Sequence, residues 1–347
     1  MYKLEPKDYK RVANLIKSDN DLSVFSVIHN RMPGNIFVND IDQPTSALIR
    51  TSECNLIAGR IDNEEFNAKI SDELDFWDPV IPDTQEWEKQ VPFVHKNRFI
   101  RKYTRCHYFL VREKFIDSNN NRLLPNGFII EQVNLEFLRN NKFKNSEQLL
   151  QAIEDWKSDE DFIKHGGGSY VRNNDEIVSY SLWDCSYLNQ VEIGIHTTEN
   201  YRKKGFGIIA AAETVRTCFE KGYTKIRWTC VQANKGSKAI AKKLGFELKG
   251  VYSAFSSYPP IENLLDLSES EWNEWAEYFE NSAKTEPNLW TESLVAYIKA
   301  NNVAKANEVL ALQRLNGSIE HNFSGLIQYL HSIGMATDFS ENGIHID

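Results

Sequence analysis

The clearest pattern in this chain is a short strand, a glycine turn and a long apolar helix in direct succession. Residues 191–196 carry apolar, β-branched side chains at alternate positions, which predicts a strand with one buried face. Residues 208–220 carry apolar side chains at helical spacing and include three consecutive alanines, which predicts a closely packed helix. The turn between them contains Gly205 and Gly207. Such a turn directs the unpaired N–H groups of the first helical turn to one place, where a phosphate can bind.

The chain around this motif continues to alternate between predicted strands and helices. A second strand over 225–231 precedes a helix over 235–244, and Gly245 is placed to end that helix in the left-handed conformation. A hairpin is predicted across the turn-rich residues 173–175. The further elements predicted here are strands over 128–133, 170–172, 177–184 and 251–256, and helices over 135–140 and 146–156.

The first part of the chain has a pattern of its own. A helix is expected over 7–17, and three short strands follow with turns between them. A polar, turn-rich segment over 117–127 then favours a linker. The other elements predicted before the linker are strands over 35–38, 46–51, 55–59 and 106–111, and helices over 63–76 and 86–93.

From about residue 268 the pattern becomes entirely helical. Ser268 and Ser270 offer hydroxyl groups that could cap a helix ahead of apolar positions at helical spacing. Three further helices are predicted over 289–300, 303–315 and 322–333. The segment therefore resembles a small antiparallel bundle, which could pack on the rest of the chain or form a homodimer surface.

Composition limits the classes of protein that remain. The 347 residues are 41% hydrophobic and 26% charged, as in ordinary globular proteins, and contain no run of 18 apolar residues that could cross a membrane. The first residues lack the apolar core of a signal peptide. Five scattered cysteines without C-x-x-C spacing argue against disulfides and zinc and suit the cytoplasm. The net charge of −9 disfavours nucleic acid as a partner and is compatible with a cationic substrate.

The glycine turn can be compared with known phosphate-binding loops. It lacks both the G-x-G-x-x-G fingerprint of dinucleotide-binding proteins and the G-x-x-x-x-G-K-[ST] loop of nucleotide-binding proteins. The pattern Arg202-x-x-Gly205-x-Gly207 resembles instead the pyrophosphate loop of the GNAT superfamily of acetyl-CoA-dependent acyltransferases. Downstream, Asn234-x-x-Ser237 and the Leu-Gly-Phe at 244–246 resemble the next block of the same superfamily.

The resemblance can be narrowed on residues 124–258. Glu192-Ile-Gly-Ile195 followed by Thr197, and Trp228-x-Cys230 followed by Asn234, are similar to a bacterial GNAT subgroup that includes the zwittermicin-A resistance acetyltransferase. The resemblance implies an α/β (α+β) fold with mixed, mostly antiparallel GNAT sheets flanked by helices. It also implies tandem GNAT-like domains, the first without the Arg-x-x-Gly-x-Gly loop. The predicted domains are a degenerate GNAT-like domain over 1–118, a catalytic domain over 119–262 and a helical appendage over 263–347.

The resemblance also implies which residues hold the co-substrate, acetyl-CoA; no metal is expected. Backbone N–H groups of the turn would bind the pyrophosphate, and those near the end of the strand over 191–196 would orient the thioester carbonyl. Asn234 would reach the pantetheine arm. The residues implied to contact acetyl-CoA are Ile195, His196, Thr197, Arg202, Lys203, Lys204, Gly205, Phe206, Gly207, Ile208, Asn234 and Ser237.

A general base is needed because a free alkyl amine has a pKa of about 10.4 and is almost fully protonated at neutral pH. Glu192 is the main candidate, since strand alternation places it on one face with Gly194, which leaves room for a substrate. A structural alternative is that Glu192 pairs with a lysine. His196 is a second candidate base, and Asp184 could instead bind a cationic amine.

The leaving thiolate would take a proton from a tyrosine, as is common in this superfamily. Tyr252, six residues after Phe246, is the first candidate and Tyr258 the second. Coenzyme A is a fair leaving group without help, because a thiol pKa lies near 8.5. Loss of the tyrosine should therefore slow turnover without abolishing it.

The sequence thus predicts a cytoplasmic N-acetyltransferase that acetylates a primary amine of a small-molecule or peptide-like, antibiotic-type substrate by direct transfer. A role in antibiotic resistance or self-protection is implied by the resemblance alone. Alternatives are an acetyltransferase for protein, peptide or metabolite amines, a module that binds acetyl-CoA without catalysis, and a scaffold that uses the helical segment as its partner surface. No nucleic-acid or membrane partner is expected.

Overall fold

The computed structural model describes residues 1–74, 78–94, 100–117, 124–256, 267–315, 338–340 and 343–345. The chain divides into two compact units, Met1–Ser257 and Tyr258–Asp347, which are described separately. A domain boundary near residue 118, inside the first unit, stays a prediction.

A single mixed sheet of twelve strands runs through the described part of the first unit, in the order β1-β2-β3-β4-β5-β12-β6-β11-β10-β9-β8-β7. Neighbours pair antiparallel except for β4 with β5 and β10 with β11, which are parallel. The strands are β1 Tyr2–Lys3, β2 Asn35–Val38, β3 Ser46–Arg50, β4 Asn55–Gly59, β5 Val80–Pro82, β6 Arg101–Leu110, β7 Phe128–Gln132, β8 Gly168–Asn173, β9 Glu176–Tyr187, β10 Gln190–Thr197, β11 Lys225–Val231 and β12 Glu247–Ser256.

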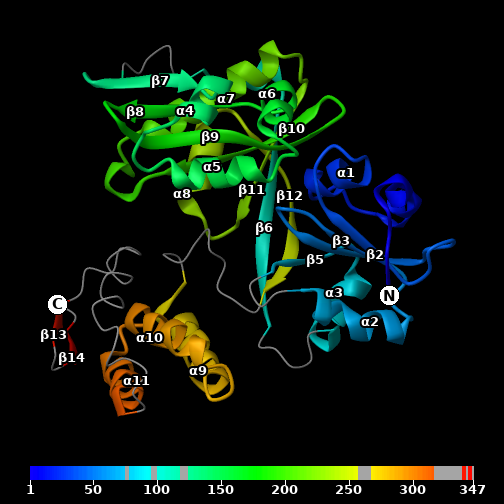
Figure 1. Cartoon of the computed structure of the whole chain (residues 1–347), viewed down its shortest axis with the longest axis vertical. Coiled ribbons are helices and arrows are strands. Elements are labelled where there is room, and N and C mark those ends of the chain that lie inside the picture. Colours follow the sequence, from blue (N-terminus) through cyan, green and yellow to red (C-terminus); the bar gives the residue numbers. More distant parts are fainter. Residues whose placement is uncertain are drawn as a thin grey trace. The chain divides into compact units, whose positions relative to one another are not determined.

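Helices cover both faces of this sheet. Ile195 and Glu192 point to opposite faces of β10, because side chains alternate along a strand. Ile195 lies against the start of α7, and Glu192 lies against the start of α1. The two helices therefore pack on opposite faces (Figure 1). The α-helices of the unit are α1 Leu22–Ile28, α2 Glu64–Ile70, α3 Gln85–Val94, α4 Leu135–Asn140, α5 Glu147–Glu154, α6 Asp159–His165, α7 Phe206–Glu220 and α8 Lys235–Lys243, and a 3₁₀ helix covers Pro6–Leu15.

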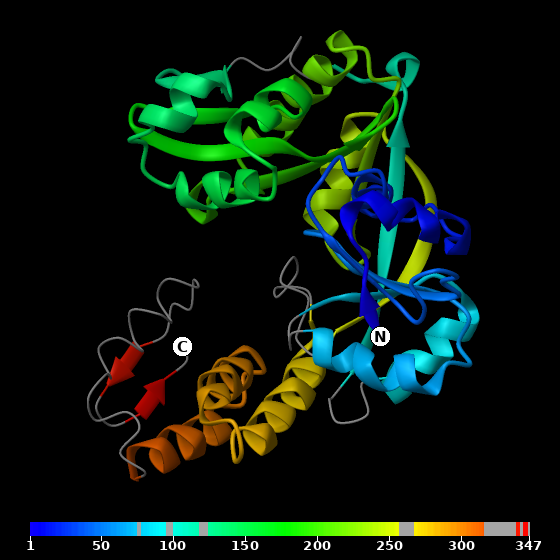
Figure 2. The same cartoon turned by 45° about the vertical axis from the view of Figure 1, so that its right-hand side comes forward.

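Strand β6 joins the early and late parts of the sheet. It pairs with β11 along one edge and with β12 along the other, so Cys106 lies between Cys230 and Val251. Figures 1 and 2 show β6 as a long teal strand beside the yellow β12. The strand predicted over 106–111 thus begins five residues earlier, at Arg101. Its two neighbours, β11 and β12, both follow the predicted linker in the chain. Part of that linker, 118–123, lies outside the described residues.

The described part of the second unit starts with three α-helices, with a 3₁₀ turn over Pro287–Leu289 between the first two (gold to orange in Figures 1 and 2). Ser268 caps the first through a reciprocal capping box with Glu271, which confirms the predicted helix start. Trp272, Trp275 and Phe279 form its buried face. The helix predicted over 322–333 lies outside the described residues. The described elements are α9 Glu269–Ser282, α10 Trp290–Lys299, α11 Val303–Leu315, β13 Asp338–Ser340 and β14 Gly343–His345.

The predicted fold class is confirmed, and the differences are local. The segment predicted as a helix over 7–17 forms a 3₁₀ helix instead. Helices α1 and α6 were not predicted, because each has seven residues and too few turns to show a helical period. No helix in the described ranges is long and apolar enough to cross a membrane.

Candidate active site

The central feature of the site is the separation of β10 from β11. The two parallel strands pair at only three positions, the last of which joins Glu192 to Arg227. Beyond that point β10 continues to pair with β9, and β11 continues to pair with β6. In the described structure, β10 and β11 therefore do not pair with each other beyond Glu192 and Arg227.

The predicted phosphate turn lies just after this opening. Lys203 and Gly205 adopt left-handed backbone conformations, with φ of 62° and 94°. Helix α7 begins at Phe206, and no described side chain caps its first N–H groups. A Cβ atom on Gly207 would lie 2.8 Å from Ile195 Cδ1 and 3.0 Å from Thr197 Oγ1, so α7 lies close against the end of β10 at this glycine. The turn therefore presents open N–H groups beside the end of β10.

The basic residues of the turn are exposed. Arg202 Nε donates a hydrogen bond to the Thr197 carbonyl oxygen at 3.2 Å, which ties the turn to the end of β10. Lys203 and Lys204 are exposed, and Lys204 Nζ lies 5.4 Å from the centre of the Tyr201 ring, whereas the side chains of Phe206 and Ile208 are buried in the core. Only the backbone of Phe206 and Ile208 is therefore available to a coenzyme.

Asn234 and Ser237 have structural contacts in the described residues. The side chain of Asn234 caps α8 by accepting a hydrogen bond from the Ser237 N–H at 2.9 Å. The Ser237 hydroxyl accepts a hydrogen bond from Trp228 Nε1 at 2.8 Å. These contacts fix the start of α8, and the predicted coenzyme contacts of both residues stay predictions.

Glu192 lies where the strands separate and is 4% exposed. Its Oε2 atom is 3.8 Å from Arg227 Nε and has no hydrogen-bond partner among the described residues. Burial raises the pKa of Glu192 to about 7, with a further contribution from Asp21; Arg227 and Arg105 and a hydrogen bond to the Leu22 backbone oppose this rise. The predicted pairing of Glu192 with a lysine is wrong, because its ion-pair partner is an arginine.

The other candidate bases differ from Glu192 in their surroundings. His196 stacks on Tyr180 with ring centroids 5.3 Å apart, and burial and Arg202 lower its pKa. Asp184 occupies the space that Gly194 leaves, because a Cβ atom there would lie 2.6 Å from Asp184 Oδ1. The carboxylate of Asp184 therefore fills part of the space over Gly194 that was predicted to receive a substrate.

Tyr252 lies on β12 opposite Arg105 and is buried. Its hydroxyl oxygen accepts a hydrogen bond from Arg105 Nε at 3.1 Å. Burial raises the pKa of Tyr252 well above its ordinary value, so the hydroxyl keeps its proton. Tyr258, the second candidate, lies outside the described residues.

Several charged residues at this site were not identified from the sequence. Asp21 and Glu53 come from the first part of the chain, and both act electrostatically on Glu192 or its neighbours. Arg105 on β6 is only 7% exposed and donates a hydrogen bond to Tyr252. The sequence held one indication of this charged site. Arg227 lies among the apolar residues of β11, where a charge needs a buried partner.

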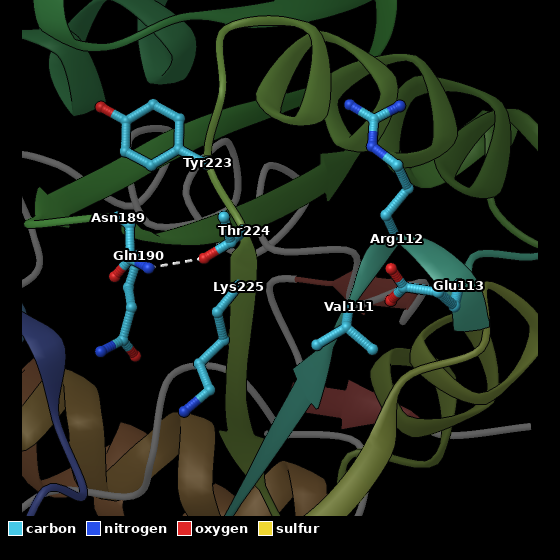
Figure 3. A pocket seen from close by; sticks show the side chains of 8 residues that line it. All are labelled: Val111, Arg112, Glu113, Asn189, Gln190, Tyr223, Thr224 and Lys225. Atoms are coloured by element: carbon cyan, nitrogen blue, oxygen red, sulfur yellow. Dashed lines mark hydrogen bonds between the residues drawn. The ribbon is translucent and has the colours of Figure 1, made fainter.

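A pocket of about 450 Å³ lies at the opposite end of β10 (Figure 3). Asn189 Nδ2 donates a hydrogen bond to Thr224 Oγ1 there at 2.6 Å. The pocket is separated from the glycine turn by the 15 residues of α7, or roughly 22 Å at 1.5 Å per residue. It is therefore distinct from the site between β10 and β11. Its lining residues are Val111, Arg112, Glu113, Asn189, Gln190, Tyr223, Thr224 and Lys225.

Comparison with known proteins adds to this geometry. Residues 13–255 match the GNAT acetyltransferase family. The chain is 24% identical over 259 residues to the uncharacterized N-acetyltransferase YdfB of Bacillus subtilis (strain 168), a match that covers 67% of this chain and 89% of YdfB.

Two solved structures align with this chain over most of its length. A GCN5-related N-acetyltransferase-like protein from Streptococcus suis aligns with a TM-score of 0.59 at 21% identity, over 72% of this chain and 98% of that one. A tandem GNAT protein from the clavulanic acid biosynthesis pathway aligns with a TM-score of 0.47 at 9% identity, over 73% of this chain and 94% of that one.

Proposed function

This chain belongs to the GNAT acetyltransferase family, and we propose that it acetylates a primary amine of a small-molecule or peptide-like acceptor. Membership makes it an N-acetyltransferase and implies acetyl-CoA and an amine acceptor. The observation that carries the proposal is the separation of β10 from β11 immediately beyond the buried carboxylate of Glu192.

The described residues fit acetyl-CoA at the glycine turn. The open N–H groups at the start of α7 would hold the pyrophosphate, since no side chain of the described structure occupies them. Lys203 and Lys204 would add positive charge beside it, and Arg202 would keep the turn at the end of β10. Bound there, acetyl-CoA supplies an acetyl thioester, and its pantetheine arm would pass Asn234 and Ser237.

The open edge of β10 would orient the acetyl carbonyl. Backbone N–H groups near Ile195, His196 and Thr197 lie along the strand beyond its last pair with β11. Fixed donors of this kind stabilise developing negative charge on oxygen, and one such donor is worth about 3–4 kcal/mol.

Glu192 would remove the proton that makes the acceptor amine nucleophilic. Its pKa of about 7 lies near neutral pH, which suits a group that must accept a proton and later release it. The proton would move from the amine nitrogen to the unpartnered Oε2 atom.

Tyr252 would supply a proton to the departing thiolate. We expect Tyr252→Phe to lower kcat by about tenfold or less, because coenzyme A is a fair leaving group without protonation. Steady-state kinetics with one amine would measure this, and Tyr278→Phe on α9 is a matched control. Unchanged turnover in Tyr252→Phe would contradict the assignment of Tyr252.

The proposed acceptor class and biological role follow from the sequence resemblance. The resemblance to the zwittermicin-A resistance subgroup favours an antibiotic-type amine and a role in resistance or self-protection. An acetyltransferase for protein, peptide or metabolite amines is the alternative, and a screen of amines from each class would distinguish them. A chain that binds acetyl-CoA but releases no thiol with any amine would instead be a binding module.

The first test is a calorimetric titration with acetyl-CoA. We expect one site in the wild type and at least tenfold weaker binding in the double variant Lys203→Glu, Lys204→Glu, because two exposed cations near the pyrophosphate become anions. Lys10→Glu, which changes an exposed lysine in the first 3₁₀ helix, is the control and should bind normally. Equal binding in all three proteins would remove the turn from the coenzyme site.

A further inference from the structure

A bulge in β9 places a second carboxylate over β10, at Gly194, two residues along the strand from Glu192. Glu192 lies opposite Cys185 and Ile193 lies opposite Trp183, so Asp184 is an extra residue without a register partner. Bulges of this kind change the direction of a side chain. The carboxylate of Asp184 is consequently placed over Gly194, on the same face of β10 as Glu192.

The turn between β3 and β4 brings a third carboxylate from the first part of the chain. Thr51 Oγ1 accepts hydrogen bonds from the N–H groups of Glu53 and Cys54, at 3.0 and 2.9 Å, and lies 2.8 Å from Ser23 Oγ. Ser23 follows Leu22, whose backbone contacts Glu192. These contacts hold the turn that carries Glu53 beside the start of α1 and Glu192.

These carboxylates have few hydrogen-bond donors in the described residues, and the one that Glu192 has comes from the Leu22 backbone. In the described residues no group donates to the side chain of Glu53 or Asp184, and Oε2 of the 4% exposed Glu192 has no hydrogen-bond partner. Glu53 and Asp184 are half-buried and therefore within reach of a ligand. Buried carboxylates without donors are stabilised either by protonation or by a cation with N–H donors that binds among them, and such a cation favours their charged form.

The electrostatics agree with this geometry. Burial, with Asp21 and Glu192, raises the pKa of Glu53 to about 8, and burial and Glu53 raise the pKa of Asp184. In the described ranges no three or more His, Cys, Asp or Glu are placed to hold a metal ion. The charged and titratable groups around the three carboxylates are Asp21, Cys54, Arg105, Asp155, Cys185, Arg227 and Tyr252.

We infer that Glu53 and Asp184 form a second cation site beside Glu192, so that the acceptor is an amine carrying a further positive charge. The inference rests on the proposed function, because Glu192 receives the reacting amine while Glu53 and Asp184 bind the other ammonium group. The first part of the chain thereby contributes a substrate-binding residue to the site.

The test compares putrescine with butylamine, which has the same carbon chain and one ammonium group. The wild type is expected to have a kcat/KM at least about tenfold higher for putrescine, the effect of one further hydrogen-bonded charge. Glu53→Gln should reduce this preference to near unity, mainly by raising the KM for putrescine. Glu64→Gln, an exposed residue of the same part of the chain, should keep the full preference.

A binding measurement separates the two proposals. Putrescine in the presence of coenzyme A should raise the melting temperature of the wild type more than butylamine does, and Glu53→Gln should lose the difference. Turnover of both amines without a putrescine preference would overturn the cation site and leave the proposed function standing. A Glu53-dependent shift without turnover of any amine would support the cation site and contradict the proposed function.

Discussion

Replacing Glu192 with glutamine is expected to lower kcat by about 10²–10⁴-fold, the usual contribution of a general base. Glutamine keeps the size and polarity of the side chain but cannot accept the amine proton. Because the pKa of Glu192 is raised to about 7, log kcat of the wild type should rise with pH up to about pH 7 and then level. This rise should disappear in Glu192→Gln. Steady-state kinetics at saturating amine between pH 5.5 and about 9 would measure both effects.

The control for this variant is Glu199→Gln, which changes an exposed glutamate just beyond β10. It should keep the wild-type rate and pH profile. If Glu192→Gln instead retained kcat and the profile, the base would have to be another group, and Asp184 and His196 would be the next to replace.

Replacing Arg227 with methionine is expected to destabilise the first unit by about 3–5 kcal/mol, the typical effect of removing one partner from a buried ion pair. Arg227 and Glu192 have side chains that are 2% and 6% exposed. Arg227 also donates a hydrogen bond to the Asp19 carbonyl oxygen and lies 5.0 Å from the centre of the Phe109 ring. The variant would leave Glu192 buried without its main opposing charge.

The loss of stability in Arg227→Met should depend on pH. A carboxyl group whose pKa is higher in the folded chain than in the unfolded chain lowers stability as pH rises from the unfolded pKa, about 4.3, to the folded one. For wild-type Glu192 this decrease is complete near pH 7. Without Arg227 the folded pKa is higher, so stability should continue to fall above pH 7.

Urea unfolding at pH 6 and pH 8 would test this. The difference between Arg227→Met and the wild type should be larger at pH 8. Arg139→Met is the matched control, because Arg139 pairs with Glu160 on the surface, where such pairs contribute about 0–1 kcal/mol. An Arg227→Met variant as stable as this control at both pH values would contradict the importance of the buried pair.

The glycine turn could be predicted because its signals are local. The strand before it, the left-handed Gly205 and the apolar helix after it lie within 30 residues, and each has a pattern that one segment can show. The helix after β11 and the left-handed Gly245 at its end were predictable for the same reason, whereas the capping of α8 by Asn234 was not predicted.

The charged surroundings of Glu192 could not be predicted in this way. Asp21 and Glu53 are more than 130 positions away in the chain and reach Glu192 only through tertiary contacts. Helix α1, which brings Asp21 there, is almost entirely buried, so its apolar run shows no helical period. The bulge that directs Asp184 toward β10 also depends on pairing between strands.

The position of β6 limits how this protein can be divided or recombined. A fragment that began after residue 118 would lose the strand that separates β11 from β12, and each of these would gain an unpaired edge prone to association with other chains. Exchange of the later half alone between relatives would therefore interrupt the sheet at its centre. Gene shuffling, whether in evolution or in the laboratory, should retain both halves as one inherited module.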